Sequence, residues 1–364
     1  MNKALTNRQC SFIVYSAIVG YGLINLPQNV SEAGGTIGWI SILIVTVAAG
    51  AATYIITYLC YNNENKIIYE YSEELVGKFI TFIFKIIFIT YFILIFSYLI
   101  RMYAETLKLV MLIRTPIWAI EMLLYSVVFY AISKGPSVIG RVCELYVPMA
   151  IIGIIIMSFI LFTQGRLINL RPFFMKQGVM SYIKSSYQLI LPFLGMELLL
   201  FMPISKKNNR GLYKYTIFTV LFIGIFYIFV VESAISVVGV ETAVIYKASL
   251  FNIVRGVDVH YLEFFRRLDG IYMIIWTIDV FCSICLWGYS LTVSLGSIFK
   301  GARFNAVLTV TIIISFIISL APKSKMLVEK IINYASYLGI AAAFFIPTIL
   351  FIVMKVKNHD KKIQ

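Results

Sequence analysis

Charged residues are scarce in this sequence. Only 13% of its 364 residues are Asp, Glu, Lys or Arg, whereas 60% are hydrophobic and the mean hydropathy is +0.90. A water-soluble globule needs more polar surface than this composition supplies. The sequence therefore predicts an all-α integral membrane protein, with one transmembrane domain over residues 1–364 and no soluble domain.

Histidine and cysteine are also rare. The two histidines, His260 and His359, lie at opposite ends of the predicted spans and cannot form a metal cluster. The five cysteines are scattered, which argues against a disulfide framework. Cys282 and Cys285 form a CxxC motif, but inside an apolar helix this spacing places two small side chains on one face. We interpret the motif as packing rather than redox or metal chemistry, and we expect neither a metal nor a cofactor.

Motifs of enzyme active sites are absent. The sequence contains no GxSxG, no HExxH and no GxxxxGK[ST], so we expect no enzymatic activity. Its net charge of +14 comes from Lys and Arg residues between the apolar stretches. We therefore expect contact with an anionic lipid bilayer and none with nucleic acid.

Long apolar stretches are abundant. A helix needs roughly 20 apolar residues to cross a bilayer, and we predict about ten spans by that rule. Lys3 and Arg8 precede the first span without a small-residue cleavage pattern, so we expect a retained span and not a signal peptide. The predicted spans cover approximately residues 9–30, 37–60, 79–104, 116–134, 138–163, 181–205, 212–240, 267–299, 303–321 and 331–356.

Two connections between the spans, about residues 164–180 and 241–266, are long enough to carry structure. The second could form a short surface helix that caps a site, as substrate lids do.

Basic residues are biased toward one set of loops. Their distribution predicts that both termini are cytoplasmic. On that orientation the cytoplasmic set is Lys3, Arg8, Lys66, Lys78, Lys134, Arg141, Lys206, Lys207, Arg210, Lys214, Lys300, Arg303, Lys355, Lys357, Lys361 and Lys362, and the outer set is Lys108, Arg114, Arg166, Arg171, Lys176, Lys247, Arg255, Lys323, Lys325 and Lys330.

Spans one and six each contain residues that interrupt a helix. Gly lowers the barrier to leaving the helix, and Pro removes a backbone donor and clashes with the preceding turn. In hydrocarbon, unwound backbone is tolerated only where it lines a cavity or meets a ligand. The matching positions predict a transporter-type site at the bilayer midplane, between inverted repeats over about residues 9–163 and 181–356. The interrupting residues are Gly20, Gly22 and Pro27 in span one, and Pro192 and Gly195 in span six.

Broken helices also have an electrostatic use. The N-terminus of a half-helix presents unpaired N–H groups to a carboxylate, and the C-terminus of the opposing half-helix presents carbonyls to an ammonium group. A free amino acid carries both groups.

Ionisable residues inside the spans usually face a cavity or a partner. Glu197 lies within a turn of Gly195 and could receive a proton, bind a substrate amine or accept hydrogen bonds from loosened backbone. Alternatively, its carboxyl group is protonated and ties two helices together. The other intramembrane acids are Glu121, Glu144, Glu232 and Asp279.

Two further spans offer candidate ligand contacts. In span eight, Asp279 precedes a polar and aromatic face whose hydroxyl groups could satisfy a cation or ordered water, although such hydroxyls often bond to their own helix. In span three, Tyr91 and Tyr98 lie two turns apart, and each could close over a small ligand. We favour Tyr98 because span three packs beside the broken helices in architectures of this kind.

Several segments carry recognisable motifs. Residues 186–199 resemble an F-x-G-x-E motif, and residues 267–276 resemble an E-R-x-D-x-x-x-x-x-W motif, with Phe265 and Arg266 in place of the usual Glu. With the opening residues 5–9, the Gly-Tyr-Gly of span one and the Leu-Pro at 26–27, these segments resemble one protein family, that of the B subunit of bacterial spore germinant receptors, the spore germination permeases.

The resemblance implies the amino acid/polyamine/organocation transporter fold, with ten helices in two inverted five-helix repeats (LeuT-like) and helices 1 and 6 broken. It implies residence in the inner membrane of a bacterial spore, beside an A-type membrane subunit and a C-type lipoprotein subunit. The implied nutrient pocket lies between spans one, three, six and eight. Its residues would be Gly20, Tyr21, Gly22, Tyr98, Leu194, Gly195, Glu197, Ser283, Trp287 and Tyr289.

The leading hypothesis is therefore a nutrient-sensing receptor subunit that binds a small germinant, most simply an amino acid, and passes a conformational bias to its partners. The alternative is an amino acid permease coupled to protons or Na+, with Glu197 or Asp279 as the coupling group. A subunit that binds no ligand and only anchors its partners would leave both helix breaks without a role.

Overall fold

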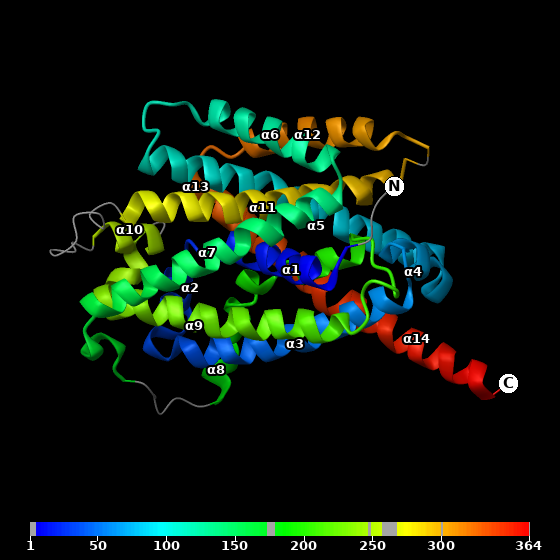
Figure 1. The fold of residues 1–364 in the computed structure, drawn as a ribbon, viewed down its shortest axis with the longest axis horizontal. Coiled ribbons are helices and arrows are strands. Elements are labelled where there is room, and N and C mark those ends of the chain that lie inside the picture. Colours follow the sequence, from blue (N-terminus) through cyan, green and yellow to red (C-terminus); the bar gives the residue numbers. More distant parts are fainter. Residues whose placement is uncertain (1–4, 173–178, 247–248, 257–267, 300, 364) are drawn as a thin grey trace.

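The computed structural model describes residues 5–172, 179–246, 249–256, 268–299 and 301–363, and these residues are helical almost throughout. Figure 1 shows a bundle of long, roughly aligned helices. The α-helices are α1 (Asn7–Gly22), α2 (Leu26–Gly34), α3 (Gly38–Asn62), α4 (Ile68–Val76), α5 (Lys78–Val110), α6 (Ile117–Ser133), α7 (Pro136–Gln164), α8 (Val179–Gln188), α9 (Leu212–Ile245), α10 (Ser249–Arg255), α11 (Leu268–Gly296), α12 (Phe304–Leu320), α13 (Lys325–Ile340) and α14 (Ile346–Ile363).

Five short helical turns complete the described part of the chain. The 3-10 turns are η1 (Gly35–Ile37), η2 (Leu167–Leu170), η3 (Leu191–Phe193) and η4 (Met196–Phe201), and η6 (Ala341–Phe345) is a π turn between α13 and α14.

Each of the ten predicted spans coincides with one helix or with one interrupted helix. Six helical stretches are long and apolar enough to cross a membrane, and three shorter apolar helices accompany them. Span one is α1 with α2, span six is α8 with η3 and η4, and span ten is α13 with α14. The chain is therefore a multi-pass membrane protein, as predicted.

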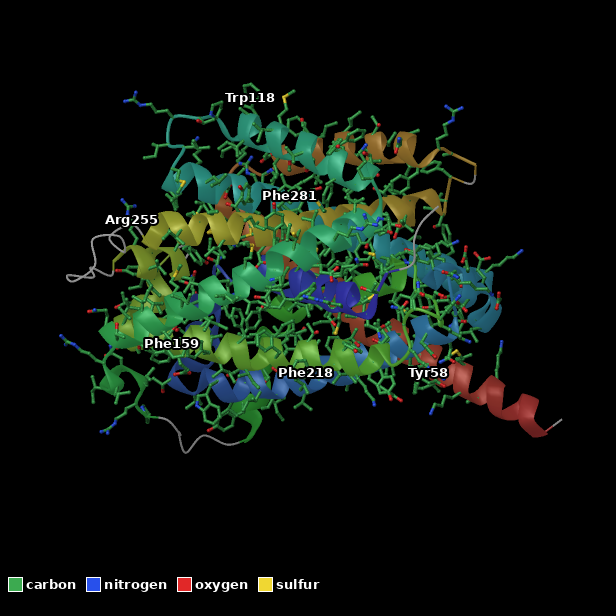
Figure 2. The ribbon with its side chains drawn as sticks, in the orientation of Figure 1. Tyr58, Trp118, Phe159, Phe218, Arg255 and Phe281 are labelled. Carbon is green, nitrogen blue, oxygen red and sulfur yellow. The ribbon has the colours of Figure 1, made fainter. Side chains whose placement is uncertain are left out.

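The surface of the bundle carries large apolar side chains. Trp118 on α6, Phe159 on α7 and Phe218 on α9 are 55%, 59% and 71% exposed, and Figure 2 labels them among the outward side chains. Exposed rings of this size would be costly in water but suit a lipid environment.

Capping residues set the start of the first helix. The Thr6 hydroxyl accepts a hydrogen bond from the Gln9 amide, and the Gln9 side chain accepts one from the Thr6 amide. This reciprocal capping box satisfies two donors that would otherwise be unpaired.

Helix α1 lies at the centre of the bundle and contacts α7, α9 and α11, whereas α6 and α12 lie together at the periphery. Helix α4, which the sequence analysis did not predict, lies at one end of the bundle, and α10 lies at the opposite end (Figure 1). At the α4 end, Lys85 of the third span pairs with Glu73 at 3.0 Å.

The connection predicted over residues 241–266 contains a short helix, α10, in its described part. Four of its apolar side chains are buried against α2, α9 and α11. They are Leu250, Phe251, Ile253 and Val254. Residues 247–248 and 257–266 of this connection lie outside the described residues.

Candidate ligand-binding site

The first span is interrupted over three residues. Helix α1 continues through Gly22, and α2 begins at Leu26, so residues 23–25 form the break. The amides of Ile24 and Asn25 donate to no acceptor within the described residues, and the buried side-chain oxygen of Asn25 also lacks a partner. The break therefore holds unused main-chain donors inside the membrane-spanning bundle.

The glycines before this break serve close packing rather than unwinding. A Cβ atom at Gly20 would lie 2.6 Å from the main-chain oxygen of Asp279 on α11. A Cβ at Gly22 would lie 2.6 Å from the Tyr227 hydroxyl and 3.1 Å from the carbonyl oxygen of Pro192. Both glycines remain helical, and the non-helical residues follow them, so the interruption lies later than predicted.

The second break lies in span six, where α8 gives way to the 3-10 turns η3 and η4. Gly195 has φ of 129°, a backbone conformation that side-chain-bearing residues rarely adopt. A Cβ there would lie 2.7 Å from the carbonyl group of Ala17 on α1. The glycine of span six thus unwinds the helix and also lets the two broken spans touch.

Glu197 holds this second break in place. Its side chain is fully buried, and one carboxylate oxygen accepts a hydrogen bond from the Gly195 amide at 2.9 Å. The other oxygen accepts one from the Tyr91 hydroxyl of α5 at 2.8 Å. Glu197 therefore accepts a hydrogen bond from unwound backbone in span six and also links span six to α5.

Tyr227 of α9 joins the two broken spans, and it was not among the predicted site residues. Its hydroxyl lies 3.2 Å from the carbonyl oxygen of Ile18 and 3.1 Å from that of Pro192. It can donate its single proton to one of these carbonyls at a time. A signal existed, since Tyr227 supplies a phenolic hydroxyl in the middle of a span that is otherwise mostly apolar.

Helix α10, at the opposite end of the bundle from α4, satisfies a backbone carbonyl of the first break. The Leu250 amide donates to the carbonyl oxygen of Ile24 at 3.1 Å. The Ser249 hydroxyl lies 3.4 Å from the same carbonyl and accepts a hydrogen bond from the Gln28 amide at 3.2 Å. The carbonyl freed at residue 24 is therefore satisfied by the cap.

These bonds correct one detail of the predicted electrostatics. The first turn of α2 was expected to offer free N–H groups to a carboxylate, but Leu26, Gln28 and Asn29 donate to Leu23, Ser249 and Asn25. Pro27 has no N–H group. The available donors are instead the amides of Ile24 and Asn25, which precede the helix.

A small cavity lies against the first break, and we call it the break cavity. It encloses about 20 Å³ between α1, α5 and α11. A single water needs roughly 10–15 Å³ of such space, so the cavity admits only a water-sized occupant. Its lining residues are Gly20, Ile24, Leu99, Met102, Tyr103, Thr106, Trp276 and Val280.

Trp276 gives the break cavity a polar group. Its side chain is 3% exposed, and its indole N–H has no acceptor within the described residues. The ring packs 5.4 Å from the ring of Tyr103, whose hydroxyl is bonded to Thr277. A buried donor without an acceptor is unusual in a folded protein and is expected where a ligand supplies the acceptor.

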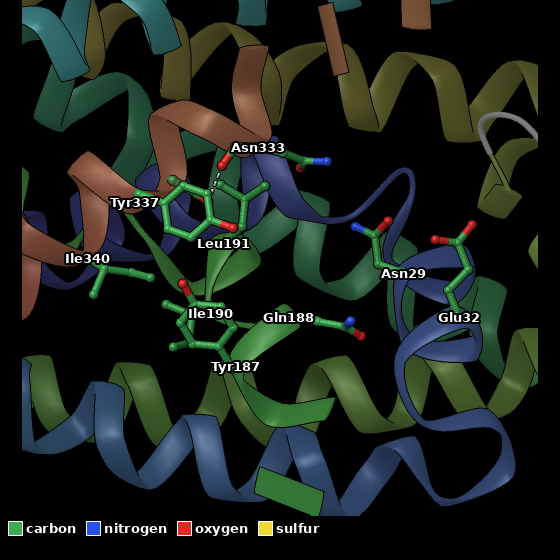
Figure 3. A pocket seen from close by; sticks show the side chains of 10 residues that line it. Asn29, Glu32, Tyr187, Gln188, Ile190, Leu191, Asn333, Tyr337 and Ile340 are labelled. Atoms are coloured by element: carbon green, nitrogen blue, oxygen red, sulfur yellow. Dashed lines mark hydrogen bonds between the residues drawn. The ribbon is translucent and has the colours of Figure 1, made fainter. Parts of the chain in front are cut away.

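A larger pocket opens between α2, α8 and α13, and we call it the polar pocket. It encloses about 360 Å³. Figure 3 shows Asn29 and Glu32 on one side of it and the Tyr187 and Tyr337 rings on the other, with Gln188 reaching toward the α2 side. None of its described lining residues is basic. Asn333, Ser336, Ile190, Leu191 and Ile340 complete the lining, and Leu191 belongs to the second break.

The structure places the predicted pocket residues in several different environments. Gly20 lines the break cavity, whereas Leu194 contacts span ten at Gly339. In α5, Tyr91 rather than Tyr98 reaches Glu197. The same helix lines the break cavity with residues that follow Tyr98 in the sequence, among them Leu99, Met102 and Tyr103. The side chain of Tyr21 lies outside the described residues.

The predicted residues of α11 also point in different directions. Ser283 contacts α1 beside Gly20, and Trp287 packs against the rings of Tyr91 and Phe92. Tyr289 faces away from the breaks, with its ring 6.0 Å from that of Phe304 near α12.

The other intramembrane acids have separate surroundings. Glu121 is buried and accepts hydrogen bonds from Arg101 and from Ser319, which ties α5, α6 and α12 together. Glu144 pairs with Arg8 near the start of α1. Glu232 is half-buried on α9 without a hydrogen bond or ion pair to another described residue. No group of three or more His, Cys, Asp or Glu side chains that could hold a metal ion occurs in the described ranges.

Comparisons with known proteins agree on one family and one fold. A family model described as "Spore germination protein" matches residues 4–328. Spore germination protein YndE of Bacillus subtilis (strain 168) is 25% identical over 98% of both chains. Spore germination protein A2 of the same organism is 27% identical over 95% of this chain and 94% of its own.

Solved structures show the fold. A Na+-coupled sialic acid symporter superposes with a TM-score of 0.67 at 12% identity, over 94% of this chain and 78% of its own. MhsT, solved in complex with L-phenylalanine, gives a TM-score of 0.65 at 12% identity, over 97% of this chain and 99% of its own. Both likenesses agree with the predicted LeuT-like arrangement of ten spans.

Proposed function

Because this chain belongs to the spore germination permease family, we propose that it is the nutrient-sensing membrane subunit of a spore germinant receptor. The family and the transporter fold make it a non-enzymatic membrane transporter or receptor. We propose further that it resides in the inner membrane of the spore, with both termini cytoplasmic, beside an A-type membrane subunit and a C-type lipoprotein subunit.

One observation carries the proposed binding site. Two interrupted spans meet at the centre of the bundle, and unused donors lie at the first break and in the break cavity beside it: the amides of Ile24 and Asn25 and the indole N–H of Trp276. Buried donors without acceptors are costly unless something occupies them. A carboxylate matches several N–H donors, which supports a free amino acid as the nutrient.

The small volume of the break cavity supports a sensing mechanism. A space of about 20 Å³ cannot accept an amino acid, so binding requires α1, α5 and α11 to separate locally. A ligand that binds only the expanded arrangement shifts the population toward it. The rearranged helices would pass the change to the partner subunits.

A permease is the second candidate function. The fold is shared with a Na+-coupled symporter, and the buried carboxylates of Glu197 and Asp279 lie in the two broken-helix neighbourhoods. Uptake of labelled amino acids into vesicles that contain the purified chain would favour the permease. Saturable binding without uptake would favour the receptor.

The proposed site is tested by changing Trp276 to Phe in spores. The substitution keeps a buried aromatic ring but removes the unpartnered N–H together with part of the indole, so the thermal stability of the unliganded variant is measured beside the germination response. A lost hydrogen bond to a charged ligand group costs about 1.5–3 kcal/mol. The nutrient concentration for half-maximal germination should therefore rise by roughly tenfold or more.

The matched control is Trp118→Phe, since Trp118 lies on the outer face of α6 and is 55% exposed. Immunoblots should show equal amounts of both variants in the spore membrane. An unchanged germination response in Trp276→Phe spores would contradict the proposed site.

A further inference from the structure

Asp279 is a fully buried intramembrane acid that has no partner among the described residues. Its side chain is 1% exposed, and neither carboxylate oxygen accepts a hydrogen bond within the described residues. By contrast, Glu197, Glu121 and Glu144 each have at least one donor. Burying an uncompensated carboxylate is among the most costly arrangements in a protein, and in a membrane it marks a functional position.

The groups around Asp279 are oxygen-rich and are likewise unused. Ser283 lies one turn farther along α11, and its hydroxyl has no partner. Tyr272 lies two turns before Asp279 on α11, Tyr15 lies on the neighbouring α1, and both hydroxyls are buried without partners. The Tyr227 hydroxyl of α9 is bonded to the carbonyl oxygen of Ile18 on α1. No described basic side chain forms an ion pair with Asp279.

We propose that Asp279 binds one positive charge at the junction of α1, α9 and α11, carried by an alkali-metal cation or by the ammonium group of the nutrient. One carboxylate with neutral hydroxyl groups balances a single positive charge. A Ca²⁺ site would be expected to contain several carboxylate or carbonyl ligands. Binding of the nutrient's ammonium group rests on the proposed function, whereas binding of an alkali-metal cation does not.

The position of Asp279 connects this charge to the break cavity. Its main chain touches α1 at Gly20, and its neighbours Trp276 and Val280 line the cavity. A cation beside the carboxylate would stabilise the same packing of α1 against α11 that shapes the nutrient site. Binding of the two ligands would then be coupled, and the coupling is reciprocal.

The experiment uses the purified full-length chain in nanodiscs at constant pH and ionic strength. Na+ or K+ replaces N-methyl-D-glucamine while thermal unfolding and tryptophan fluorescence are recorded. A parallel arm measures binding of a panel of neutral L-amino acids and of the corresponding des-amino acids. The variant is Asp279→Asn, and the matched control is Glu232→Gln, an intramembrane acid on another face of the bundle.

Two results would support the proposal and identify the source of the charge. If an alkali cation occupies the site, Na+ or K+ should raise the unfolding midpoint saturably in the wild type and in Glu232→Gln but not in Asp279→Asn. If the ammonium group occupies it, Asp279→Asn should weaken amino acid binding by at least about tenfold. Binding of the des-amino acids should then be unaffected by this change.

The proposal is overturned if Asp279→Asn changes neither the effect of alkali cations on the unfolding midpoint nor the affinity for amino acids. The carboxyl group of Asp279 is then neutral and structural. If Asp279→Asn binds amino acids as strongly as the wild type does, and alkali cations do not change the unfolding midpoint of the wild type, this inference alone is overturned. If the wild type binds no amino acid, the proposed function fails, and the alkali arm decides the present inference. Should Asp279→Asn not fold, Ser283→Ala replaces it, with several-fold weaker cation binding expected.

Discussion

At the scale of single residues, the glycines of the two broken spans have different physical roles. Gly195 adopts a backbone conformation with φ of 129° that other residues rarely adopt. Gly20 and Gly22 are helical, and what they provide is space for α11, Tyr227 and Pro192. The same residue type therefore unwinds one span and lets the other span pack closely.

This distinction predicts the effect of adding one methyl group. Gly20→Ala should destabilise the protein by about 1–3 kcal/mol, because its Cβ would overlap the main chain of Asp279, which cannot move away easily. The matched control is Gly50→Ala in α3, where a Cβ meets nothing within 4 Å, and its effect should be neutral or slightly stabilising. Denaturation in detergent micelles measures both. Equal stability of the two variants would show that α1 and α11 are not tightly packed at Gly20.

Single residues were also where the sequence analysis was least accurate. The spacing of Tyr91 and Tyr98 placed both on one face of a helix, but only the packed structure shows that Tyr91 meets Glu197. Tyr289 was grouped with the site and faces Phe304 instead. Which neighbour a side chain meets depends on helix rotation and tilt, and these are set by the whole bundle rather than by local sequence.

At the scale of elements, prediction was more successful because hydropathy and helix-breaking residues are local properties. The positions of the ten spans follow from apolar length, and the interruptions of spans one and six follow from the positions of Gly and Pro. Helix α4 was missed because its nine residues lack the apolar length of a span. The polar pocket was missed because its amide groups come from three elements that are distant in sequence.

Helix α10 is the element that stabilises the first break, and this role can be measured. Ser249→Ala removes the acceptor for the Gln28 amide and one of the hydrogen bonds to the Ile24 carbonyl. Exchange of the bonded amides of Leu26, Gln28 and Asn29 should become faster by roughly tenfold, since an unsatisfied buried group costs about 1–3 kcal/mol. Ser126→Ala is the control, because that hydroxyl bonds only within its own helix. Unchanged exchange in Ser249→Ala would mean that α10 does not restrain the break.

At the scale of the whole molecule, the volumes of the polar pocket and the break cavity indicate a protein that is closed at its centre. The polar pocket of about 360 Å³ can hold a small solute, whereas the break cavity of about 20 Å³ cannot. The Tyr227 hydroxyl lies within hydrogen-bond distance of a main-chain carbonyl in each broken span, and Glu197 fixes the second break through the Gly195 amide and the Tyr91 hydroxyl. A nutrient must exchange these internal contacts for its own, which gives the differential affinity that a conformational signal requires.

The most direct measurement of the central claim is equilibrium binding of labelled amino acids to the purified chain and to its Gly195→Ala variant. A Cβ at position 195 would overlap the Ala17 carbonyl, and residues with a side chain rarely adopt the φ of 129° found there, so the variant loses the local backbone of the second break and its packing against α1. The account predicts saturable binding of at least one amino acid to the wild type, with one site per chain, and affinity weaker by about tenfold or more in the variant. Binding of equal strength to both proteins, or no saturable binding to the wild type, would contradict it.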